Sequence, residues 1–159
     1  MTAITTVDRG PRVVARSVTV NAPAEELFGL VTDPRKHGLV DGSGTVKSNI
    51  KGPSTLSEGA KFTTSMRMYG VPYRITSTVT EYIDTPDQKV IEWAHPAGHR
   101  WRWEFTPLSD TSTRVTETFD YSSVPSLQAK MFELFKVPAQ NATGIEGTLR
   151  RLQSQYSRS

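Results

Sequence analysis

The sequence contains no cysteine, which excludes disulfide bridges, thiol catalysis and cysteine-based metal sites. It also lacks long apolar runs: no stretch approaches the roughly 18 residues that a membrane-spanning helix needs. The first residues, MTAITTVDRGPR, have no apolar core of the kind that signal peptides carry. These absences predict a cytoplasmic protein without a membrane span.

Several motifs of known chemistry are absent too. No nucleophile elbow, Walker or Rossmann pattern occurs, and Gly42-Ser43-Gly44 lacks the strand–turn–helix context of a phosphate-binding loop. The net charge is only +3, from 19 basic and 16 acidic residues spread along the chain. Arg150, Arg151 and Arg158 suit a solvated helix end rather than the dense basic stripe that nucleic acid requires. We therefore expect no cofactor and no nucleic-acid partner.

The chain is long enough to form one domain with its own core. At 159 residues it can bury roughly 70% of its unfolded surface without staples. No internal repeat or low-complexity tract divides it. We expect a single domain over residues 1–159, with a loose polar segment at 1–11.

The segment from His99 to Tyr121 has the strongest pattern in the chain. Apolar and polar residues alternate before and after a turn at 107–112, as in an antiparallel hairpin with one dry face. Glu117 is the exception, because its parity places a carboxylate among aromatic rings, where an unpaired charge is costly. The residues expected on the dry face are Trp101, Trp103, Phe105, Val115, Glu117, Phe119 and Tyr121.

The order of the remaining elements predicts an α+β fold. Strands are expected at 12–20, 45–51, 61–69, 73–83 and 89–95, followed by the two strands of the hairpin. Two short helices, one from Pro23 to Asp33 and one at 34–39, separate the first two strands. Helices at 126–136 and 139–156 end the chain, and 126–136 has Leu127, Met131, Leu134 and Phe135 as its apolar side. This order favours a seven-stranded curved antiparallel sheet wrapped around the long C-terminal helix.

Three local stretches resemble known proteins. Ser17–Phe28 (SVTVNAPAEELF) is similar to the first strand and helix of bacterial helix-grip proteins, Thr113–Thr118 (TRVTET) to their last strand, and Gly147–Leu152 (GTLRRL) to the end of their long helix. With the element order, the chain resembles the Bet v 1-like and START-related (SRPBCC) superfamily, in its polyketide cyclase/dehydrase-like branch. The resemblance implies an internal apolar pocket between sheet and helix. Members include lipid and hormone carriers, polyketide cyclases, chaperone co-activators and ribosome-associated toxins, so the fold does not decide the function.

Large aromatic side chains on three successive strands are the main candidates for a pocket wall. Tryptophan suits an apolar cavity that must orient a ligand, and methionine adds adaptable surface; ordinary core packing is the alternative for both. Gly144 and Gly147 in the last helix either allow close packing on the sheet or leave room for a ligand. The residues expected to bind ligand are Met66, Met68, Tyr73, Trp93, Trp101, Trp103, Phe119, Met131, Phe135 and Gly144.

Titratable residues on inward positions or loops are the catalytic candidates. Burial of Glu117 in a pocket would raise its pKa and make it a general acid or base. The alternatives are pairing with an arginine or a tyrosine hydroxyl, or a strand register that places the carboxylate in solvent. Arg16 and Glu81 also have inward parity, and one or both are expected to pair across the sheet. The catalytic candidates are Glu117, Tyr73 and His95.

The two histidines that flank Pro96-Ala97-Gly98, His95 and His99, do not come with the acidic or histidine partners of a metal site, so no metal is predicted. His37 is expected at the surface. A lone histidine at the pocket mouth is instead a candidate for polarising a ligand carbonyl.

Three functions remain open at this stage. The first is binding of a small apolar ligand (lipidic, aromatic or polyketide-like) in the internal pocket. The second is a cyclase or dehydratase in which pocket side chains move protons. The third is a protein- or ribosome-interaction module, which outer faces rich in threonine and mixed charge disfavour.

Overall fold

The structure is a computed structural model that describes residues 3–33, 46–51, 56–68 and 70–156, with backbone alone at 46–51 and 66–68. The short helix expected at 34–39 lies outside the described residues, as do His37 and the glycine-rich connection that follows it.

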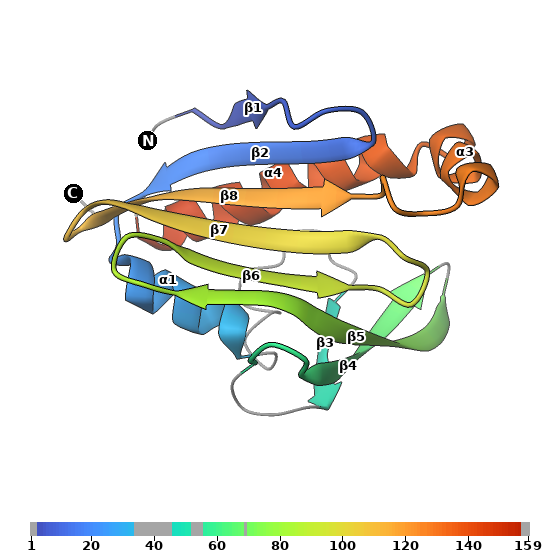
Figure 1. Cartoon of the computed structure of the whole chain (residues 1–159), viewed down its shortest axis with the longest axis horizontal. Coiled ribbons are helices and arrows are strands. Elements are labelled where there is room, and N and C mark those ends of the chain that lie inside the picture. The colour runs from blue at the N-terminus through green and yellow to red at the C-terminus, as the bar shows by residue number, and fades with distance from the viewer. Residues whose placement is uncertain (1–2, 34–45, 52–55, 69, 157–159) are drawn as a thin grey trace.

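One antiparallel sheet dominates the described part of the chain (Figure 1). Its eight strands have the spatial order β1-β2-β8-β7-β6-β5-β4-β3, so the strands from β3 to β8 form a meander and β2 lies beside β8. The expected α+β architecture is confirmed. The strands are β1 (Thr5–Val7), β2 (Val13–Val20), β3 (Val46–Lys51), β4 (Lys61–Met68), β5 (Val71–Asp84), β6 (Lys89–Ala94), β7 (Arg100–Ser109) and β8 (Ser112–Asp120).

Among the described residues, two helices cover one face of the sheet, which we call the inner face (Figure 1). Helix α1 (Ala24–Thr32) packs on β6 and β7, and helix α4 (Val137–Gln155) packs on β2 and β8. Pro23 precedes α1, and the helix ends at Asp33, as the following proline predicts. The apolar stripe of α4 is buried as its helical spacing predicts, through Ile145, Leu149 and Leu152.

The inner face is built from rows of residues that face one another across the strands. One row runs Val79, Trp93, Trp101, Phe119 and Val14. The next row runs Tyr82, Ile91, Trp103, Glu117 and Arg16. The parity predicted for the 99–121 hairpin is therefore correct, including the inward position of its carboxylate.

A β-bulge in β5 overturns part of the parity expected for that strand. The register shifts between Val79 and Glu81, so one residue of β5 lacks an opposite partner in β6. Beyond the bulge, Tyr82 faces inward while Glu81 and Ile83 face outward. The inward position expected for Glu81 is wrong, because a single extra residue reverses every later side chain.

An ion cluster occupies the outer face. Arg102 Nη1 donates to Glu81 at 2.6 Å and to Glu92 at 3.2 Å, and Arg102 Nε lies 3.5 Å from Glu104. Burial disfavours the charged guanidinium. The hydrogen bond to Glu81, the charges of Glu104 and Glu81 and the hydrogen bond to Glu92 outweigh this effect and raise the pKa of Arg102 above its ordinary value. Arg9 closes the cluster at 2.5 Å from Glu104.

The boundaries of two segments differ from those predicted from the sequence. The segment 1–11, expected to be loose, contains β1, whose Thr5 Oγ1 donates to the carbonyl of Ser17 at 3.3 Å. The hairpin turn is tighter than 107–112, because β7 continues to Ser109 and only Asp110 and Thr111 remain in the turn.

Helix α3 (Ser126–Leu134) stands at one end of the molecule, beyond the ends of β2 and β8 (Figure 1). The next helix begins after Lys136, whose left-handed backbone (φ 59°) turns the chain sharply. The apolar side expected for 126–136 points outward: Leu127 and Leu134 are 76% and 75% exposed. None of the helices in the described segments is long and apolar enough to cross a bilayer.

Candidate functional site

An aromatic cluster lies where the inner face meets α3. The ring of His99 stacks on His95, with centroids 4.2 Å apart, and meets Phe119 edge-on at 5.4 Å. From the other side, Phe132 of α3 contacts His99 edge-on at 5.7 Å. Trp101 extends the cluster along the sheet, with its ring 5.0 Å from that of Phe119. The aromatic cluster consists of His95, His99, Trp101, Phe119, Tyr121 and Phe132.

The surroundings of the two histidines in the cluster favour the uncharged form of each ring. Burial lowers the pKa of His95 below its ordinary value. Burial, and then the neighbouring His95, lowers the pKa of His99 to about 4. His95 Nδ1 accepts the Ala97 amide at 2.9 Å, which places the proton of the neutral ring on Nε2. His99 Nδ1 is buried and has no hydrogen-bond partner among the described residues.

A polar contact fixes α3 beside the cluster. The Tyr121 hydroxyl donates to Glu133 Oε2 at 2.9 Å, and Arg12 Nε lies 3.6 Å from the same oxygen. Burial and then the hydrogen bond to Glu133 raise the pKa of Tyr121 above its ordinary value. The carboxylate on α3 therefore faces the body of the protein and not solvent alone.

A groove of about 660 Å³ runs along α3 and is mostly apolar. Phe132 belongs both to this groove and to the aromatic cluster, so the two regions meet at this side chain. We call this site the α3 groove; its lining residues are Pro125, Leu127, Gln128, Met131, Phe132, Phe135 and Val137.

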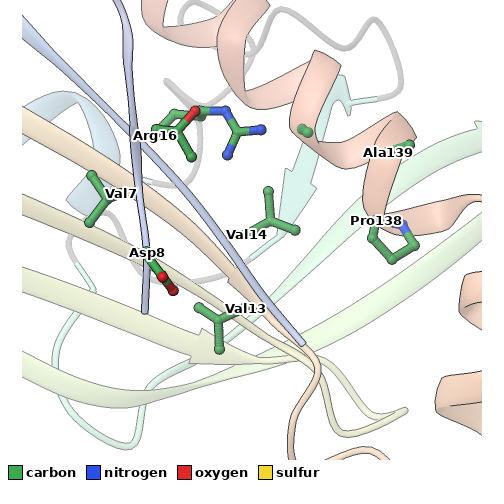
Figure 2. Close-up of a pocket in the computed structure, with 9 residues that line it drawn as sticks. Val7, Asp8, Val13, Val14, Arg16, Pro138 and Ala139 are labelled. Carbon is green, nitrogen blue, oxygen red and sulfur yellow. The ribbon is translucent and has the colours of Figure 1, made fainter. Parts of the chain in front are cut away.

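A second hollow, the edge pocket, lies between β1, β2 and the first turns of α4 (Figure 2). Its volume is about 470 Å³, and small or apolar side chains such as Val14 and Ala139 form most of its wall. Arg16 is its cation: Nε donates to Glu146 Oε2 at 3.1 Å and Nη1 to the carbonyl of Ala15 at 2.9 Å. Arg16 therefore pairs with helix α4. The pairing across the sheet that was expected of Arg16, Glu81 or both is found for Glu81, which accepts from Arg102 of β7.

Metal-ligating side chains do not gather in the part of the chain that the structure describes. No group of three or more histidine or acidic side chains there has the geometry to hold an ion. The stacked histidines lie among phenyl rings, which supply no further ligand.

Residues 11–156 match the family described as "Polyketide cyclase / dehydrase and lipid transport". The chain belongs to this family. The match spans every element from β2 to α4, so it confirms the helix-grip resemblance seen in the sequence.

The chain is also similar to individual proteins. The uncharacterized protein Rv0088 of Mycobacterium tuberculosis is 52% identical over 160 residues, which cover 99% of this chain and 70% of that protein. The solved hypothetical protein jhp0584 from Helicobacter pylori superposes with a TM-score of 0.69 at 15% identity, over 98% of this chain and 99% of that one. The di-domain ARO/CYC BexL from the BE-7585A biosynthetic pathway superposes with a TM-score of 0.66 at 16% identity, over 90% of this chain and 45% of that one. At these identities the solved structures show the fold alone.

Within this polyketide cyclase/dehydrase fold, the residues predicted to bind ligand fall into three groups. Trp103 and Phe119 are packed in the core, with 3% and 1% of their surface exposed. Trp93, Trp101 and Tyr73 are half-buried on the inner face, and Gly144 is half-buried on α4. Met131 and Phe135 line the α3 groove, while the side chains of Met66 and Met68 lie outside the described part of the structure.

Glu117 occupies the buried inward position that its parity predicts, with 7% of its surface exposed. Its neighbours across the strands are Arg16 and Trp103. It is not among the residues that line the α3 groove or the edge pocket, and neither is Tyr73. The catalytic role of Glu117, Tyr73 and His95 therefore stays a prediction.

Phe132 and the edge pocket were not predicted from the sequence. The spacing of Ala129, Phe132 and Glu133 was the available signal for the side of α3 that faces the body. It is weaker than the opposite stripe of four large apolar residues. The edge pocket had no such signal, because one of its walls is the strand that lies within the segment expected to be loose.

Proposed function

We propose that the protein binds a small, mostly apolar ligand between the inner face of the sheet and helices α3 and α4. The family description, which couples polyketide cyclisation with lipid transport, supports a ligand of this class. The position of Phe132, which lines the α3 groove and contacts His99 of the aromatic cluster, supports this location of the ligand.

This proposal rests on a buried nitrogen atom of His99. Its Nδ1 atom is buried among the rings of His95, Phe119 and Phe132 and has no hydrogen-bond partner in the described residues. A buried polar atom without a partner costs on the order of 1–3 kcal/mol. A ligand hydroxyl or carbonyl that reaches this atom when α3 shifts would remove the cost. The apolar remainder of the ligand would lie against Trp101 and Trp93.

A second function, a cyclase or dehydratase, is favoured by one observation. Glu117 is a buried carboxylate on the same inner face, one row away from Trp101. Glu117→Gln separates the two functions, since it leaves ligand affinity within about threefold in a carrier and abolishes turnover in an enzyme. The third function, an interaction module acting through the outer face of the sheet, finds less support, because that face carries the Arg102 ion cluster.

Binding is tested by native mass spectrometry of the protein purified from its own host, and by titration with a fluorescent fatty acid. The three tryptophans on β6 and β7 provide an intrinsic signal. We expect Phe132→Ala and Trp101→Ala each to weaken probe binding at least about tenfold, which corresponds to about 1.4 kcal/mol. The matched control is Leu108→Ala, which removes an exposed apolar side chain from β7. Unchanged affinity in both the Phe132→Ala and the Trp101→Ala variant would refute the proposed site.

A further inference from the structure

The outer surface of α3 is the most apolar exposed region in the described part of the chain. The described residues include seven exposed large hydrophobic side chains, and four of these lie at or near α3. Their exposed fractions are 76% for Leu127, 50% for Met131, 75% for Leu134 and 65% for Phe135. We call these four residues, together with Lys130 and Lys136, the α3 surface.

The charges of this surface have one sign. Lys130 and Lys136 are exposed and form no ion pair with the other described residues. The acidic residue of the helix, Glu133, is engaged by the Tyr121 hydroxyl and by Arg12 on the side facing the body. An approaching surface therefore meets apolar side chains bordered by two free ammonium groups.

The position of α3 leaves its outer side accessible. The helix stands at one extremity of the molecule, while the β7–β8 hairpin forms the opposite end (Figure 1). A flat partner can therefore contact α3 without meeting the strands of the sheet. A second copy of the chain fits less well, because pairing like surfaces would bring four lysines together.

We propose that the α3 surface docks the protein onto an anionic lipid bilayer. Leu127, Leu134 and Phe135 would enter the boundary between headgroups and acyl chains, and the two lysines would contact anionic headgroups. This inference goes beyond ligand binding, since bilayer contact needs no occupied site inside the protein. Leu127, Met131 and Phe135 also line the α3 groove, so the test uses Leu134 and Lys130, which do not.

The test is co-sedimentation of the full chain, without added ligand, on phosphatidylcholine vesicles with and without phosphatidylglycerol. We expect binding to the mixed vesicles, weakened by salt, and roughly tenfold weaker binding to phosphatidylcholine alone. Leu134→Asp should abolish most of the binding, and Lys130→Glu should weaken it roughly fivefold. Neither residue lines the α3 groove, so these variants leave the proposed ligand site intact.

The matched control is Leu108→Asp, which adds the same charge at an exposed leucine on the β7 strand. We expect it to bind vesicles as the wild type does. Failure of the wild type to sediment with mixed vesicles, or equal losses in Leu134→Asp and Leu108→Asp, would overturn the proposal. So would a dimer in size-exclusion chromatography that Leu134→Asp dissociates, because it would assign the surface to a second copy.

Discussion

Phe132 of α3 packs edge-on against His99, the residue before β7, with ring centroids 5.7 Å apart and an interplanar angle of 73°. This contact joins the helix that stands at the end of the molecule to the aromatic row of the inner face. A movement of α3 would therefore uncover His99, and the proposed ligand beside His99 would affect the position of α3.

Acid should destabilise the protein through His99. Its pKa falls from an ordinary value near 6.5 to about 4 in the folded protein, so the neutral ring is the stable form inside. The stabilisation is fully present above about pH 6.5 and is lost as the pH falls toward 4. Allowing for partial exposure, the loss is on the order of 2 kcal/mol. Urea denaturation at a series of pH values measures it.

The control for this pH dependence is His99→Phe, which keeps a ring in the cluster and removes the titration. We expect the unfolding free energy of this variant to decline less between about pH 7 and pH 5 than that of the wild type. Identical pH profiles for the two proteins would show that His99 does not govern acid stability.

Loss of the Tyr121 hydroxyl should loosen α3. Tyr121→Phe removes the 2.9 Å hydrogen bond to Glu133 and keeps the ring that packs on Phe132. We expect a stability loss of about 1 kcal/mol, with faster amide hydrogen exchange concentrated in residues 126–136. Tyr82→Phe removes a hydroxyl far from α3 and should leave that exchange unchanged. Equal protection of α3 in both variants would contradict this account.

Two leucines on the C-terminal helices should differ sharply in cost. Leu149 on α4 is fully buried against the sheet, whereas Leu134 on α3 is 75% exposed. Leu149→Ala should destabilise the protein by about 3 kcal/mol through a core cavity. Leu134→Ala should change stability by no more than about 0.5 kcal/mol. Similar thermal midpoints for the two variants would show that α3 is not oriented as described.

Arg102 should be the critical member of the outer ion cluster. Arg102→Met leaves Glu92 and Glu104, each 11% exposed, beside one another with fewer cations. We expect a loss of about 1–3 kcal/mol that shrinks when salt is added. Arg114→Met, at an exposed arginine of β8 without an ion pair among the described residues, is the control and should be nearly neutral. If Arg102→Met left the free energy of unfolding unchanged, the cluster would add nothing to stability.

The order of elements and the inner face of the hairpin were predictable because they rest on strong alternation. Trp101, Trp103 and Phe119 face inward as their parity predicts. The inward position predicted for Glu81 from parity is wrong, because a β-bulge changes the backbone locally and does not alter the apolar and polar pattern of the sequence. The edge strand β1 was missed because an edge strand is held by backbone hydrogen bonds, which need no apolar pattern.

The candidate site was only partly predictable, since periodicity shows that a helix has two sides but not which side meets the protein. The stripe of Leu127, Met131 and Leu134 is the more apolar side of α3, yet Ala129 and Phe132 face the sheet. The protonation of His99 depends on rings from three separated segments, and sequence spacing does not reveal such a contact.

The most direct test of the ligand site is amide chemical-shift mapping of the isotope-labelled protein during titration with a fatty acid. We expect the largest shifts at Trp93, His99, Trp101 and Phe132, with the outer-face amides of Glu81 and Arg102 nearly unmoved. Shifts confined to the outer face, or no saturable shifts at all, would contradict binding between the inner face and the helices.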